Sequence, residues 1–129
     1  MRSTFRRAVA LTAVTGGLLA VAAGTAAAKS DISVSVSTHA LRVGQSVQVT
    51  ARGGDDAVRV TYVCVDQRLG SGAWRQVGCS GTPGSALTVR VSAGQRGQEQ
   101  FRARLLARRA GDGRLVTDRL SGPATVRVG

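Results

Sequence analysis

The sequence predicts a single all-β domain, folded as an antiparallel β-sandwich of about seven strands. Short runs of alternating apolar and polar residues recur along the chain after residue 28, and turn-forming residues separate these runs at nearly even spacing. No stretch in that part keeps the 3.6-residue period of an amphipathic helix. Many short strands at such spacing are typical of sandwiches.

Each predicted strand has one apolar and one polar side, which places one face on a core and the other in water. The apolar sides, in chain order, are Ile32, Val34 and Val36; Val47, Val49 and Ala51; Val58, Val60, Tyr62 and Cys64; Leu87, Val89 and Val91; Phe101, Ala103, Leu105 and Ala107; and Ala124, Val126 and Val128.

Turn-forming residues mark the boundaries between these strands. The segment Gly53-Gly54-Asp55-Asp56 is one predicted turn. Ser121-Gly122-Pro123 interrupts the last strand, because proline cannot donate a backbone hydrogen bond to a ladder. We therefore expect the segment from Arg114 to Leu120 to be the first half of a strand that continues at Ala124.

The segment from Val58 to Gly81 predicts a β-hairpin that holds both cysteines of the chain, Cys64 and Cys79. If they face each other across an antiparallel ladder, Gly70 to Ala73 remain as the loop, a turn-forming composition at a favoured length. A disulfide there contributes about 3 kcal/mol in the loop-entropy model. The same register pairs Asp66 with Val77, Arg68 with Arg75 and Leu69 with Trp74.

Residues 1–28 have the pattern of a secretory signal peptide. A positive start with three arginines precedes an apolar run, and Ala26-Ala27-Ala28 offers a cleavage site before Lys29. A retained membrane anchor is the alternative, but the many alanines and glycines make a poor bilayer span. We expect a secreted, extracellular domain of residues 29–129, without a transmembrane segment after cleavage, in a compartment that favours a disulfide over free thiols.

The run from Ser37 to Val49, STHALRVGQSVQV, resembles the start of many bacterial immunoglobulin-like domains, in which a vGq.v.v run opens the second strand. This resemblance implies an immunoglobulin-like sandwich. The cysteine-closed hairpin is similar to hairpins of two small secreted actinobacterial families, the apoproteins of the enediyne chromoproteins and the tendamistat type of amylase inhibitor. Both families carry a second disulfide, which the two cysteines of this chain cannot supply.

Basic residues outnumber acidic ones two to one in the predicted domain. Residues 29–129 hold 15 basic residues against 7 acidic ones, a net charge of +8. All but one of the basic residues are arginine and asparagine is absent, a composition typical of a GC-rich genome. Codon usage is therefore an alternative source of much of this charge.

The sequence offers no constellation of catalytic or metal-ligating residues, so we expect no enzyme activity, no cofactor and no metal site. His39 is the only histidine and falls in a predicted loop, and no G-x-S-x-G nucleophile elbow is present. Asp55-Asp56 is the only acidic pair. A turn explains this pair better than calcium, which needs more oxygen ligands.

The exposed arginines are the main functional signal, and the function they predict is a non-catalytic binding or structural module. A sheet face that carries several arginines suits phosphate or sulfate polymers, among them anionic cell-envelope polymers, lipid headgroups and extracellular nucleic acid. A solvated face in an arginine-rich chain is the alternative. Sequence-specific nucleic-acid binding is not expected, because few aromatic residues are present to stack on bases. Five arginines should share one sheet face if immunoglobulin-like strand order holds: Arg59, Arg102, Arg104, Arg108 and Arg127.

Trp74 and Arg75 form a second candidate contact at the end of the hairpin loop, because Trp and Arg are enriched in interface hot spots. Through them the domain would bind an extracellular protein, as an inhibitor of an extracellular hydrolase. The alternative packs Trp74 against Leu69 as a cross-strand pair. A small-molecule carrier of the chromoprotein type is a third interpretation, disfavoured by the scarcity of aromatic residues to line a cleft.

Overall fold

The period-2 alternation of the sequence produces strands throughout the described chain. The computed structural model describes residues 30–56, 60–84 and 86–129, and these ranges contain strands but no helix. The predicted signal peptide, residues 1–28, lies outside them and stays a prediction. The strands are β1 Ser30–Val36, β2 Ala40–Leu41, β3 Ser46–Asp55, β4 Thr61–Leu69, β5 Arg75–Cys79, β6 Ala86–Ser92, β7 Gly97–Arg108, β8 Leu115–Leu120 and β9 Ala124–Val128.

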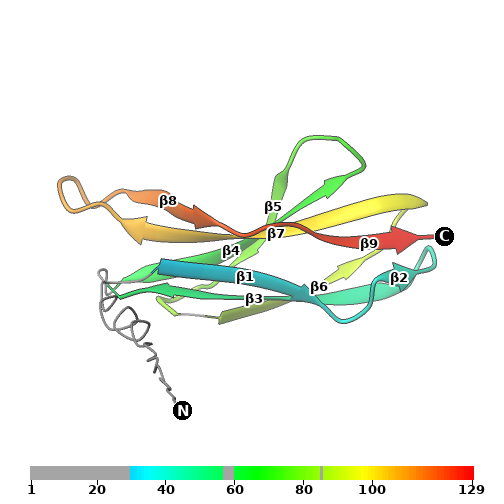
Figure 1. The fold of residues 1–129 in the computed structure, drawn as a ribbon, viewed down its shortest axis with the longest axis horizontal. Helices are drawn as coiled ribbons and strands as arrows, with labels where there is room; N and C mark the ends of the chain where they lie inside the picture. Colours follow the sequence, from blue (N-terminus) through cyan, green and yellow to red (C-terminus); the bar gives the residue numbers. More distant parts are fainter. Residues whose placement is uncertain (1–29, 57–59, 85) are drawn as a thin grey trace, which may run out of the picture.

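The strands form two facing sheets, which confirms the predicted sandwich (Figure 1). One sheet has the order β1-β3-β6. The other has the order β2-β9-β7-β4-β5, with β8 also paired to β7. All pairings are antiparallel except that of β2 with β9. Because β1 pairs with β3 and β2 with β9, the first part of the domain contributes to both sheets.

The core lies between the sheets and is built from the apolar sides that the alternation predicts. Phe101 and Leu105 of β7 are its largest apolar side chains and are fully buried, as are Val47 and Val49 of β3. Burying each such side chain stabilises the fold by roughly 1.5–3 kcal/mol relative to exposing it. The prediction that Phe101, Ala103, Leu105 and Ala107 face inward is confirmed.

The interrupted last strand is confirmed as well. β8 and β9 both pair with β7, one after the other, so that Leu120 lies opposite Arg104 and Ala124 opposite Phe101. Ser121 bridges the interruption, because its amide donates to the carbonyl of Ala103 at 2.9 Å and its hydroxyl oxygen accepts from the amide of Ala103 at 2.8 Å. The two halves therefore pair in succession with the same side of β7, despite the intervening proline.

The hairpin of β4 and β5 contains the predicted disulfide, since Cys64 and Cys79 are paired and bonded. The predicted register beyond it is wrong by one residue. The ladder shifts between Val65 and Asp66, so that Asp66 lies opposite Gln76 and Gln67 opposite Arg75. Val77 is the extra residue of this β-bulge, and it packs against the core.

The prediction that Tyr62 faces the core is also wrong, and Cys64 is fully buried but does not belong to the core cluster. Val63 and Val65 belong to the core cluster, which places Tyr62 and Cys64 on the outer side of β4. In the run VTYVCV, both sets of alternate residues are largely apolar, so alternation within β4 cannot distinguish its two faces. Pairing with β7 decides the matter, because Tyr62 lies opposite the outward Leu106 and Cys64 opposite Arg104.

The predicted turn at Gly53-Gly54-Asp55-Asp56 is wrong in its first three residues, because β3 continues to Asp55. Gly53 pairs with Ile32 of β1 and is buried. A Cβ added to Gly53 would collide with the carbonyl oxygen of Asp31 and lie 2.6 Å from Cδ1 of Ile32. Gly53 is therefore needed for the close approach of β1 and β3 rather than for a turn.

We expect Gly53→Ala to lower the free energy of unfolding by about 2 kcal/mol, because the added methyl group has no room beside β1. Chemical denaturation measures this loss. Gly54→Ala is the matched control, since a Cβ there meets no described atom within 4 Å. An equal loss in both variants would contradict a steric cause.

Candidate functional site

The outer side of the larger sheet carries an arginine cluster on β4, β7 and β9. Side chains of β7 alternate between core and outer side, so Arg102, Arg104 and Arg108 project outward together, as predicted. Arg127 of β9 also faces outward, between the buried Val126 and Val128. Arg59 lies outside the described residues. We call the following set the arginine face: Arg68, Arg102, Arg104, Arg108 and Arg127.

Asp66 holds two arginines of this face in place. Only 3% of Asp66 is exposed. Nε of Arg102 donates to its Oδ2 at 2.9 Å, and Nε of Arg104 donates to its Oδ1 at 3.0 Å and Oδ2 at 2.8 Å. Nη2 of Arg104 also donates to Oε1 of Gln76 on β5 at 2.7 Å. A carboxylate removed from water needs charged partners of this kind.

Trp74 adds a second support from the hairpin loop. Its ring centroid lies 4.7 Å from Cζ of Arg68 and 4.4 Å from Cζ of Arg102, within cation–π range of both. Arg68 in turn donates from Nε to Oε1 of Gln100 at 2.6 Å. The predicted packing of Trp74 against Leu69 is therefore not the one observed, because the bulge moves Trp74 out of the ladder.

Two other predicted contact residues, Arg108 and Arg75, do not contact Asp66 or Trp74 in any interaction described above. Arg108 approaches the ring of Tyr62 at 5.9 Å and donates to the carbonyl of Gly113 at 2.8 Å. Arg75 is exposed on β5, opposite Gln67, so it faces away from Trp74 and toward the inner side of the sheet. The structure thus separates Trp74 and Arg75, which the sequence places side by side, and a hydrolase inhibitor that uses both stays a prediction.

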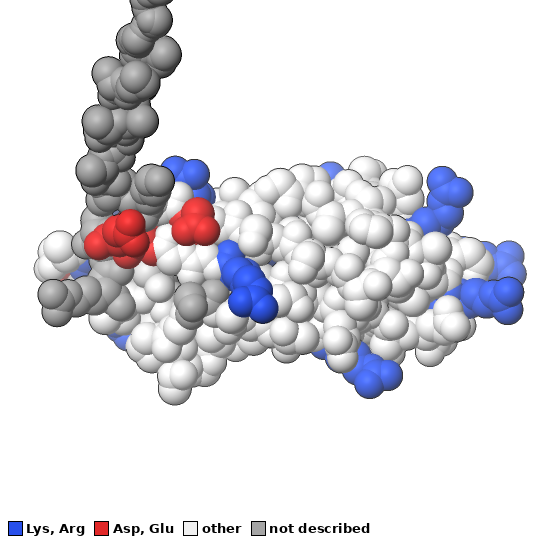
Figure 2. Space-filling view, turned by 60° about the horizontal axis from the view of Figure 1, so that its bottom comes forward, with Lys and Arg blue, Asp and Glu red and all other residues white. Residues whose placement is uncertain are grey.

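The arginine face carries five positive charges, and Asp66 offsets one of them. On the side of the smaller sheet, basic residues are scattered over the surface, and acidic residues gather at one end (Figure 2). Hydrogen bonds and ring contacts hold the guanidinium groups of Arg68, Arg102, Arg104 and Arg108 in position before any ligand arrives. The hydrogen bond from Arg102 to Asp66 uses Nε rather than a terminal guanidinium nitrogen.

Sequence reasoning missed Asp66, Arg68 and Gln100 as parts of this site. Gln100 faces outward by the same alternation that places Arg102, and its Nε2 donates to Oγ1 of Thr125 at 3.4 Å. Asp66 and Arg68 were hidden by the wrong face assigned to β4. Tyr62, Asp66 and Arg68 alternate onto the same side of β4, so assigning Tyr62 to the outer side places Asp66 and Arg68 there as well.

No group of three or more potential metal-ligating side chains comes together among the described residues. His39 is exposed between β1 and β2, and its Nδ1 lies 3.0 Å from the carbonyl oxygen of Thr125. Within the same ranges, no helix is long and apolar enough to cross a membrane.

The comparisons with known proteins identify the fold. No family model matches the sequence, and no curated protein matches it. One similar solved chain belongs to a structure on T cell specificity and activation by the bacterial superantigen toxic shock syndrome toxin-1, with TM-score 0.57, 12% identity and coverage of 78% of this chain and 99% of that one. A CARDB domain from Pyrococcus furiosus, crystallised with di-metal ions, has TM-score 0.52, 12% identity and coverage of 79% and 89%. At these identities the likeness shows a shared β-rich fold.

Proposed function

We propose that this protein is a secreted, non-catalytic binding module whose arginine face holds an anionic polymer. The observation that carries the proposal is the ordered cluster around Asp66 and Trp74, which fixes Arg68, Arg102 and Arg104 against one another. Guanidinium groups held in place bind phosphate or sulfate with a smaller loss of side-chain entropy than free ones.

The chemistry of the face favours phosphate or sulfate groups. A guanidinium presents paired N–H donors that match two oxygens of one anionic group. The outward positions of β7 repeat at every second residue, about 7 Å apart, so Arg102 and Arg104 meet successive charges of an extended chain. Envelope polymers rich in phosphate therefore fit the face, and the disulfide is compatible with the oxidising environment in which such polymers lie.

We do not expect the arginine face to recognise nucleic-acid bases. Trp74 contacts Arg68 and Arg102, so its ring is already used within the protein. Reading of single-stranded nucleic acid requires aromatic platforms that are free to stack on bases. Binding should therefore depend on the charge of the polymer and on salt, rather than on nucleotide sequence.

Heparin affinity chromatography tests the proposal with two triple variants of equal charge change. We expect Arg68→Gln/Arg108→Gln/Arg127→Gln to elute at clearly lower salt, with affinity reduced roughly hundredfold, because each arginine contributes about 1 kcal/mol near an anionic surface. The variant leaves both arginines bound to Asp66 unchanged, which protects the fold. The control is Arg42→Gln/Arg52→Gln/Arg90→Gln, whose residues are exposed outside the arginine face.

Two results would contradict a dedicated face. Equal shifts in elution for the two triple variants would mean that only net charge matters. Elution of the unmodified protein at low salt would exclude polyanion binding altogether. Phosphocellulose run in parallel shows whether phosphate replaces sulfate as the bound group.

A further inference from the structure

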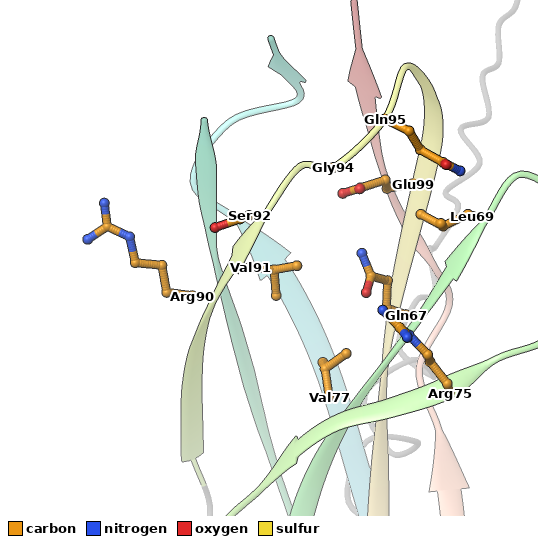
Figure 3. A pocket seen from close by; sticks show the side chains of 10 residues that line it. All are labelled: Gln67, Leu69, Arg75, Val77, Arg90, Val91, Ser92, Gly94, Gln95 and Glu99. Carbon is orange, nitrogen blue, oxygen red and sulfur yellow. The ribbon is translucent and has the colours of Figure 1, made fainter. Parts of the chain in front are cut away.

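A pocket opens at one end of the sandwich, on the inner side of the larger sheet and away from the arginine face (Figure 3). Its volume is about 420 Å³, within the range of small-molecule sites. Residues of β4, β5, β6 and β7 contribute to it, together with the loop before β7. We call it the end pocket. Its apolar wall includes Leu69, Val77 and Val91.

Glu99 of β7 is a buried carboxylate in the end pocket. Only 2% of its surface is exposed, and its Oε2 is buried with no hydrogen-bond partner in the described structure. In Figure 3 its carboxylate points from β7 toward β6. Burial raises the pKa of Glu99, and a hydrogen bond from Gln67 acts in the opposite direction. Leaving such an acceptor unpaired is costly, so a donor is expected to satisfy it.

Gln67 and Arg75 provide the complementary groups. They lie opposite each other on β4 and β5, and Gln67 is almost fully buried. Figure 3 shows the guanidinium of Arg75 reaching toward Gln67, whereas that of Arg90 turns away from the other labelled side chains. The end pocket thus combines an acceptor at Glu99, donors at Arg75 and a side-chain amide that does both at Gln67.

This combination selects among ligand classes. A simple cation would satisfy Glu99 but would meet Arg75 and a domain of net charge +8. A simple anion would satisfy Arg75 but would be repelled by the carboxylate. Hydroxyl groups donate and accept, so neighbouring hydroxyls satisfy Glu99, Gln67 and Arg75 without added charge. The valines and Leu69 offer an apolar surface for the C–H side of a ring.

We propose that the end pocket binds a neutral saccharide unit, with one ring hydroxyl donating to Oε2 of Glu99 and a neighbouring hydroxyl accepting from Arg75. The proposal concerns a different site from the arginine face and does not depend on polyanion binding.

Nuclear magnetic resonance titration of the full disulfide-bonded protein tests it, with D-glucose, D-mannose and N-acetylglucosamine as the probes. At least one of these saccharides should shift the amide signals of Glu99, Gln67 and Val91 in a saturable manner. Glu99→Gln and Arg75→Gln should each weaken this binding about tenfold, because each removes a charge-assisted hydrogen bond. Arg52→Gln, which makes the same charge change as Arg75→Gln at an exposed position of β3 outside the end pocket, should bind as the unmodified protein does.

Two further measurements distinguish a saccharide site at Glu99 from binding at the arginine face. Saccharide binding should lower the pKa of Glu99, measured on its carboxyl carbon, because a hydroxyl donor favours the ionised form. Retention of Glu99→Gln on heparin should be unchanged, which tests the two sites separately. The diamine putrescine serves as a cationic probe in a parallel titration. The proposal would be overturned if no saccharide shifted these signals or if putrescine alone did so. It would also be overturned if Glu99→Gln and Arg75→Gln bound the saccharide as tightly as the unmodified protein.

The raised pKa of Glu99 also predicts how stability depends on pH. The folded carboxyl keeps its proton to a higher pH than the unfolded one, so its contribution is fully present below the ordinary value of 4.5 and is lost as pH rises through the raised value. From about pH 4 to pH 7, the unmodified protein should therefore lose stability relative to Glu99→Gln. Denaturant titrations across this range check it, and parallel curves for the two proteins would contradict it.

Discussion

Replacing both cysteines, as Cys64→Ala/Cys79→Ala, is expected to lower the free energy of unfolding by about 3 kcal/mol. The bond closes a loop with a sequence separation of 15 residues, and opening that loop increases the entropy of the unfolded chain. The effect is large for this protein because β5 is an edge strand that pairs only with β4 within the larger sheet. Urea denaturation of the two proteins under identical conditions measures the loss.

The unmodified protein in reducing agent is the control for this double variant. Cys64 is fully buried, and the reduced protein keeps the sulfur atoms that alanine removes. The alanine protein should therefore unfold at a urea concentration no higher than that of the reduced protein. The m-value should change little if the unfolded state exposes the same surface. Equal midpoints for the oxidised and reduced proteins would show that pairing of β4 and β5 needs no covalent bond.

Asp66→Ala is expected to destabilise the protein by about 3 kcal/mol. The substitution removes the carboxylate that accepts from both Arg102 and Arg104, whose side chains are only 25% and 20% exposed. Two neighbouring guanidinium groups then face each other without the negative charge that separates them. Thermal and chemical unfolding measure the loss, and a change in the fluorescence of Trp74 would report the disturbed cluster.

Asp112→Ala is the matched control for this loss. Asp112 pairs with Arg109 at 2.6 Å, a geometry as good as that at Asp66, but both side chains are about half exposed. An exposed pair contributes little, so this variant should unfold almost where the unmodified protein does. In an Arg102→Ala/Arg104→Ala background, Asp66→Ala should cost far less. Similar losses for Asp66→Ala in both backgrounds would contradict the role of the paired charges.

The strands of this protein follow closely from local pattern. In β7 the apolar residues Phe101, Ala103 and Leu105 alternate with Arg102 and Arg104, and a strand with one buried face is the arrangement that satisfies this alternation. The outward placement of those arginines could thus be predicted. The disulfide could be predicted as well, because a chain with two cysteines and a predicted export signal has one pairing available.

Alternation does not predict which side chains face the core where both faces of a strand are apolar or where a strand changes register. In β4 the residues at both parities suit a core, and only the partner β7 determines that Val63 and Val65 are inside. The bulge at Val77 adds one residue to β5, which moves Trp74 from a cross-strand position to a contact with arginines. Both outcomes depend on packing against strands distant in sequence.

The sequence by itself determined an all-β domain, its disulfide-closed hairpin and the outward arginines of β7, because each depends on period-2 alternation or on a pairing without competitors. The tertiary structure alone decided what those arginines contact. Asp66 and Arg102 are 36 residues apart, and their meeting depends on the pairing of β4 with β7. The end pocket has the same origin, because Glu99, Gln67 and Arg75 belong to three strands whose relative positions no local pattern specifies.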